Sequence, residues 1–105
     1  MSEIEKLYEL AGVEQKYFEH FHGDGYDYPP FTVEKQLELI KLLCQQCDLT
    51  ISHFSKWDFV HYDGQEPINL SGKDFVETLA KLVNMYWQDL TETEKAEIKR
   101  ILENE

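Results

Sequence analysis

The 105-residue chain is 42% hydrophobic and 13% aromatic, so it can bury one modest core and is expected to form a single domain over residues 1–105. It is too apolar for a disordered chain, although 21 acidic residues against 10 basic ones give a formal net charge of -11. That charge excludes direct binding to duplex DNA or an anionic membrane unless a basic patch forms, and no apolar run is long enough to span a bilayer.

The N-terminal sequence MSEIEKLYELAG is acidic and has neither the basic nor the apolar part of a signal peptide. The only two cysteines, Cys44 and Cys47, would close too small a loop to stabilise the fold as a disulfide. A cytoplasmic location is therefore expected.

Residues 1–31 are expected to form a helical and loop segment. Ser2 and Glu5 have the spacing of a capping box, apolar residues follow at helical spacing, and Gly12 can end this first helix. A second short helix is predicted from Val13 to Phe21. The following sequence, HGDGYDYPP, contains two glycines, two aspartates and two prolines, which predict a loop.

Residues 32–105 predict a helix, three strands and two further helices. Thr32 is a good N-cap for the helix, which is expected to run to Cys47. Apolar residues recur along it in steps of four and three, which indicates a buried stripe. This stripe consists of Val33, Leu37, Ile40, Cys44 and Cys47.

The period changes after this helix. The sequences LTISHF (49–54), WDFVHY (57–62) and QEPINL (65–70) alternate or are rich in β-branched and aromatic residues, so they predict an antiparallel meander. Asp63-Gly64 is typical of a two-residue hairpin turn, and Pro67 favours an edge position for the last strand. One sheet face is expected to pack on the helices that contain Val33 and Phe75; it carries Leu49, Ile51, Phe59 and Ile68.

Two helices are predicted to end the chain. Ser71 with Asp74 and Thr91 with Glu94 have capping-box spacing at their starts. The predicted fold class is α+β, with a small antiparallel meander of about three strands packed against α-helices and a helical N-terminal extension.

From Tyr28 to Leu102, the order of helix, short antiparallel strands and helix resembles that of the small α-β-α sandwich proteins of phages and prophages. The sequences YPPFTVEKQLELIKLL before the strands and GKDFVETLAKLV after them carry this resemblance. It implies an accessory protein of unknown biochemical role and brings no functional residues with it.

Cys44 and Cys47 have the C-x-x-C spacing that redox enzymes and metal sites use. A redox thiol needs exposure at a helix N-terminus, whereas this pair ends its helix beside Asp48, where the helix dipole and the charge both disfavour a thiolate. We therefore expect two reduced, poorly reactive thiols that face the sheet.

A zinc site would need a second pair of ligands, from His20 and His22 or from His53 and His61. Two alternatives stay open, although neither has the strong signal of a repeated C-x-x-C pair. They are His20, His22, Cys44 and Cys47, or an oxygen-rich site of His20, His22, Asp24 and Asp27. No metal or other cofactor is predicted. No nucleophile elbow, P-loop or dinucleotide motif is present, so we predict that the protein is not an enzyme.

The stretch YFEHFHGDGYDYPPF (17–31) concentrates aromatic residues in a polar segment with glycines and prolines. Rigid amphipathic rings are favoured at protein interfaces, but they can also attach a long loop to the core of a small domain. The interaction candidates are Tyr17, Phe21, Tyr26, Tyr28 and Phe31.

The favoured hypothesis is a small acidic, non-enzymatic protein-interaction or accessory module of phage or mobile-element type. It would bind a protein partner, with no direct contact to nucleic acid or membrane. One alternative is an acidic mimic of nucleic acid that inhibits a DNA-binding protein, and another is a small metal-binding protein that uses the loop with His20 and His22. The sequence leaves a homo-oligomer open.

Overall fold

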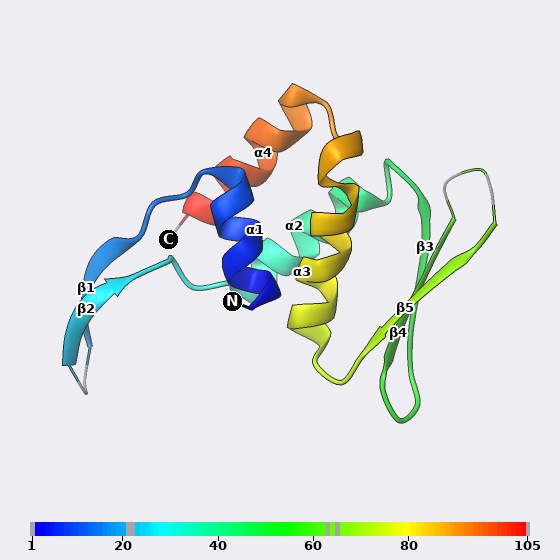
Figure 1. Cartoon of the computed structure of the whole chain (residues 1–105), viewed down its shortest axis with the longest axis horizontal. Helices are drawn as coiled ribbons and strands as arrows, with labels where there is room; N and C mark the ends of the chain where they lie inside the picture. Colours follow the sequence, from blue (N-terminus) through cyan, green and yellow to red (C-terminus); the bar gives the residue numbers. More distant parts are fainter. Residues whose placement is uncertain (1, 21–22, 63, 65, 105) are drawn as a thin grey trace.

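The computed structural model describes residues 2–20, 23–62, 64 and 66–104. In this part of the chain, α-helices form the centre, a two-stranded ribbon extends from one side, and a three-stranded sheet lies on the other (Figure 1). The α+β class and the antiparallel meander are therefore confirmed. None of the described helices is long and apolar enough to cross a membrane.

The helices are α1 (Glu3–Ala11), α2 (Val33–Leu43), α3 (Phe75–Tyr86) and α4 (Glu92–Glu103), and a short 3-10 turn, η1 (Trp87–Asp89), follows α3. The strands are β1 (Lys16–His20), β2 (Gly23–Asp27), β3 (Asp48–His53), β4 (Trp57–Tyr62) and β5 (Ile68–Gly72).

The first helix begins and ends where the sequence predicts. The Ser2 hydroxyl accepts a hydrogen bond from the Glu5 backbone N–H at 3.1 Å, and Gly12 ends α1 with a φ of 77°, which only glycine adopts readily. The helix packs along α3. The backbone N–H of Glu3 donates to the Glu77 carboxylate at 2.8 Å, and the Asn84 side-chain amide donates to the Glu3 carbonyl at 3.0 Å.

The predicted helix from Val13 to Phe21 is wrong, as is the predicted loop over residues 23–27. These segments form the antiparallel ribbon β1–β2, in which Tyr17 lies opposite Tyr26 and Phe18 opposite Gly25. Tyrosine and phenylalanine favour strands once a partner strand is available, and this pairing outweighs the helical spacing of the apolar residues. Phe21 and His22 lie outside the described residues.

The helix α2 keeps its predicted N-cap at Thr32 but ends at Leu43. Its predicted buried stripe is wrong for three residues, because Val33 is 63% exposed, Leu37 is 54% exposed and Cys44 is also exposed. The other two members agree with the prediction, since Cys47 is buried and Ile40 is half-buried against the core. The side chains that face the core are Lys35, Leu39, Leu42 and Leu43.

Lys35 explains this rotation of α2. Its ammonium donates to the carbonyl of Pro30 at 2.7 Å and to the carbonyl of Leu102 at 2.9 Å. The second carbonyl belongs to the last turn of α4, where the helix dipole favours a positive charge. The four-carbon stem of Lys35 can pack among apolar side chains while its charge is hydrogen-bonded. The leucines that share its side of α2 are therefore buried, and Val33 and Leu37 are not.

The meander has the predicted strands but a different register. His61 lies opposite Ile68 and Val60 opposite Asn69, so more residues separate β4 and β5 than the predicted two-residue turn allows. The pairing differs by two residues, which keeps every side chain on its predicted face. Asp63 lies outside the described residues.

The sheet packs mainly on α3, the predicted helix that contains Phe75, and not on α2, which was also expected to contact it. Trp57 and Phe59 contact Phe75 at ring-centroid distances of 4.9 Å and 5.4 Å. Phe59 is fully buried, and Leu49 and Ile51 on the same face are half-buried. Ile68 was also expected on the packed face, but it is exposed because it lies at the start of an edge strand.

The last two helices have capped starts. The predicted Ser71 cap of α3 is wrong, since Asp74 itself is the N-cap and accepts from the backbone N–H groups of Val76 and Glu77. The Thr91–Glu94 capping box of α4 is confirmed, and α4 buries Ile98, Ile101 and Leu102 in the core.

Replacing Lys35 tests the constraint on α2. We expect Lys35→Met to lower the free energy of unfolding by about 2–3 kcal/mol, because the buried Leu102 carbonyl and the partly buried Pro30 carbonyl lose a charged donor while the apolar stem is retained. Urea denaturation measures the change. The matched control is Lys41→Met on the exposed side of the same helix, where we expect a change within about 0.5 kcal/mol. Equal losses in the two variants would contradict this role for Lys35.

Candidate interaction surface

The aromatic interaction candidates fall into two groups. Tyr28 and Phe31 are half-buried against Tyr8, with ring centroids 4.9 Å and 6.3 Å from its ring. Tyr8 is itself buried, and its hydroxyl donates to the carbonyl of Pro29 at 2.8 Å. Tyr28 and Phe31 therefore attach the segment before α2 to the core.

Burial, together with the nearby carboxylate of Asp27, raises the pKa of Tyr8 to about 12. The hydroxyl of the folded protein thus stays protonated above pH 10, where a free tyrosine ionises, and remains a hydrogen-bond donor to Pro29.

Tyr17 and Tyr26 form the second group, on the ribbon β1–β2. They lie opposite each other in the register, with ring centroids 5.6 Å apart and ring planes at 70°, an edge-to-face contact. Both are exposed, Tyr17 by 53% and Tyr26 by 71%. The strands pack mainly on each other, and the ribbon extends away from the helices (Figure 1). This pair forms a projecting aromatic surface.

The candidate ligands of the cysteine-containing site lie in different parts of the molecule, whereas His20, Asp24 and Asp27 of the oxygen-rich alternative all lie on the ribbon β1–β2. His20 is the last residue of β1. Cys44 and Cys47 belong to the segment between α2 and β3, which lies on the side of the helices away from the ribbon (Figure 1). Among the residues that the structure describes, no three His, Cys, Asp or Glu side chains come together as metal ligands. His22 is outside these residues.

The two other histidines do not form a shared site. His53 is exposed and its ring lies 4.6 Å from that of Trp57, while His61 is buried and contacts Tyr86 through Nδ1. His53 is the last residue of β3 and lies opposite Trp57, whereas His61 lies opposite Leu49 near the other end of the sheet.

The two cysteines differ in exposure. Cys47 is buried, and its thiol donates to the carbonyl of Leu43 at 3.6 Å. Cys44 is exposed because it continues the outward side of α2. The expectation of two thiols facing the sheet is therefore wrong for Cys44.

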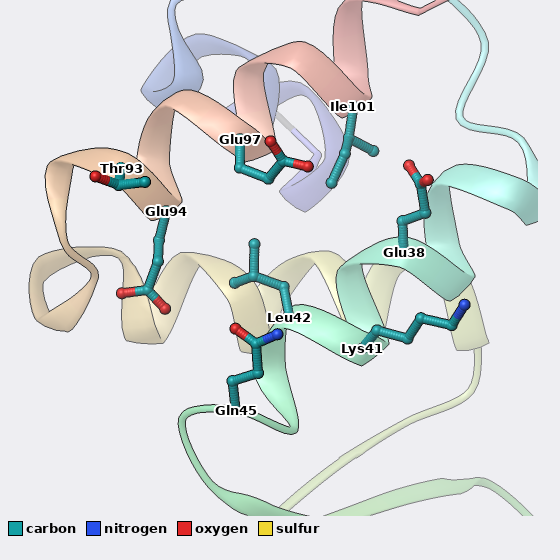
Figure 2. Close-up of a pocket in the computed structure, with 8 residues that line it drawn as sticks. All are labelled: Glu38, Lys41, Leu42, Gln45, Thr93, Glu94, Glu97 and Ile101. Atoms are coloured by element: carbon teal, nitrogen blue, oxygen red, sulfur yellow. The ribbon is translucent and has the colours of Figure 1, made fainter.

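A cleft between α2 and α4 was not predicted from the sequence. Its volume is about 430 Å³, and Figure 2 shows Leu42 of α2 pointing toward Glu97 and Ile101 of α4. Sequence patterns do not say which helices are neighbours, so no local signal could place these side chains together. The residues that line the cleft are Glu38, Lys41, Leu42, Gln45, Thr93, Glu94, Glu97 and Ile101.

The exposure of the thiols predicts their labelling. In the native protein, we expect a thiol reagent to modify Cys44 rapidly and Cys47 at least about tenfold more slowly, since access limits the buried thiol. Mass spectrometry of timed samples measures both rates. In a Cys44→Ser variant, fast labelling should disappear, and persistence of a fast phase would contradict the assignment.

The raised pKa of Tyr8 predicts a loss of stability at alkaline pH. The unfolded chain loses the Tyr8 proton near pH 10.0, while the folded chain keeps it to about pH 12, so unfolding is favoured as pH rises through this range. Below pH 9, we expect the free energy of unfolding of the wild type to be about 1 kcal/mol higher than that of Tyr8→Phe. By pH 11, we expect this difference to have disappeared. Urea denaturation of both proteins at pH 8 and pH 11 measures the difference. The lysines, which also titrate in this range, are the same in both proteins, so their effect on the free energy of unfolding cancels. A pH-independent difference would contradict the assignment.

The chain was also compared with known proteins. No protein-family model matches its sequence, and neither a curated protein nor a solved structure matches it significantly.

Proposed function

We propose that this protein is a non-enzymatic protein-interaction module that binds its partner through Tyr17 and Tyr26. The observation that carries the proposal is the exposed edge-to-face pair on a ribbon that packs mainly on itself.

Partner binding at this pair would gain apolar burial. A large apolar side chain contributes roughly 1.5–3 kcal/mol when it is fully removed from water, and tyrosine is enriched among the residues that dominate binding energy. Because a tyrosine has few rotatable bonds, little conformational freedom is lost when a partner covers it. The cross-strand contact between Tyr17 and Tyr26 restrains the rings further.

The base of the ribbon supports this role. Tyr28 follows β2 and stacks on Tyr8, and Phe31 contacts the same ring, so the chain leaving the ribbon is fixed to the core. A two-stranded ribbon alone is marginally stable in water, and a partner that covers it would also stabilise its strands. Binding and ordering of the ribbon are thus coupled.

The experiment compares the full-length protein with two variants. Tyr17→Thr/Tyr26→Thr removes the aromatic pair and replaces it with β-branched side chains, which also favour strands. Phe54→Thr is the matched control, since Phe54 is 87% exposed outside the strands of the other sheet. Each protein is immobilised and incubated with a lysate of the cells that produce it. The captured proteins are then quantified by mass spectrometry. We expect a partner that the wild type and the control retain and that the double variant loses by roughly 100-fold in affinity.

Two results would contradict the proposal. One is a wild type that captures nothing above background from the cells that produce it. The other is a partner retained equally by the double variant. A captured partner that is released at high salt would favour the acidic mimic of nucleic acid, because salt screens charge pairs but not apolar contacts.

A further inference from the structure

The cleft between α2 and α4 combines an apolar floor with an acidic rim. Leu42 and Ile101 are buried and lie at the bottom, one from each helix. Figure 2 shows Glu38 reaching from α2 toward α4, and Glu97 reaching from α4 toward α2. Lys41 also lines the cleft, but its side chain extends away from Leu42 and Glu97 (Figure 2).

The carboxylates of this rim differ in what they already bind. Glu94 is used by the fold, because it accepts from the Thr91 backbone N–H at 2.9 Å and from the side-chain amide of Gln46. Glu97 accepts from two nitrogens of Arg100, at 2.5 Å and 3.1 Å. That pair is exposed on both sides, and exposed ion pairs contribute little to stability. An incoming cation can therefore compete with Arg100 for Glu97.

Arg100 shows which cation suits this rim. Its guanidinium forms a two-pronged contact with Glu97, and the carboxylate of Glu38 also acts on it, so both charges raise the pKa of Arg100. The same contact lowers the pKa of Glu97, which keeps this carboxylate ionised. The rim thus already holds a guanidinium from the chain's own surface.

We propose that the α2–α4 cleft binds an arginine side chain presented by a basic segment of a partner protein. The apolar stem of the arginine would cover Leu42 and Ile101, and its guanidinium would bind Glu38 and Glu97. An arginine is complementary to both parts of the cleft. Its apolar stem suits the apolar floor, and its planar, bidentate guanidinium suits the acidic rim.

The size and charge of the cleft limit which molecules it can bind. A cleft of about 430 Å³ holds one or two side chains, but it is too small for a whole helix, whose diameter is about 10–12 Å. The net charge of -11 repels nucleic acid and attracts basic segments from a distance. This surface is separate from the tyrosine pair, so the inference does not depend on the proposed function.

The test uses a nine-residue peptide with the central sequence Arg-Leu-Arg in a glycine and serine background. Amide chemical shifts of the full-length protein are followed by NMR during titration, and the control peptide carries citrulline in place of arginine. We expect shifts concentrated on α2 and α4 around the cleft, and at least tenfold weaker binding of the citrulline peptide, since charge-assisted contacts are lost.

Paired variants separate the cleft from general acidity. Glu38→Gln/Glu97→Gln should weaken binding about tenfold, whereas Glu34→Gln/Glu103→Gln removes the same charge from the same helices outside the cleft and should change it less than threefold. All four positions are exposed, so the variants should remain folded, which circular dichroism checks.

Several results would overturn the inference. These are absence of binding, equal binding of the citrulline peptide, equal weakening by both variant pairs, and shifts spread over the whole acidic surface. The Tyr17→Thr/Tyr26→Thr variant should bind the peptide normally, so failure of the cleft and failure of the tyrosine surface are observed separately.

Discussion

The rest of the structure depends on how two consecutive carbonyls are held. The hydroxyl of Tyr8 binds the carbonyl of Pro29, and the ammonium of Lys35 binds that of Pro30. Prolines have no backbone N–H and a fixed φ, so this segment cannot be held by ordinary secondary structure. Side chains from α1 and α2 hold it instead. Its position sets where the ribbon leaves the core and where α2 begins.

The rotation of α2 links this attachment to the cleft. Lys35 also binds the Leu102 carbonyl, which ties α2 to the end of α4. With Lys35 inward, Leu42 faces α4 and Glu38 lies at the edge of the contact. The same rotation exposes Val33 and leaves Cys44 in solvent. The burial of Lys35, the acidic cleft and the exposure of Cys44 therefore all belong to one orientation of α2.

Features that depend on neighbouring residues could be predicted from the sequence. The caps at Ser2 and Thr32 and the capping box of Thr91 are local hydrogen-bond patterns, and the structure contains all three. Strand β4 was predicted at its observed bounds because WDFVHY is rich in aromatic and β-branched residues and interrupts the helical period.

Features that depend on distant partners could not be predicted. Val33 and Leu37 have the same apolar character as Leu39 and Leu42, so composition cannot decide which side of α2 is buried. That decision comes from a carbonyl 67 residues away. The ribbon is a similar case, since Tyr17 and Phe18 suit a helix or a strand until β2 supplies a partner. The cleft needs the packing of α2 on α4, which no local pattern encodes.

Asp27 lies in the chain between an aromatic residue that packs on the core and one that stays exposed. It ends β2, and its carboxylate accepts from the backbone N–H of Tyr28 at 2.7 Å. On one side of it, Tyr26 stands exposed on the ribbon; on the other, Tyr28 stacks on Tyr8. The core does not need the ring of Tyr26, because that ring contacts its cross-strand neighbour and solvent. The outer surface of the ribbon can therefore change in sequence without loss of the core.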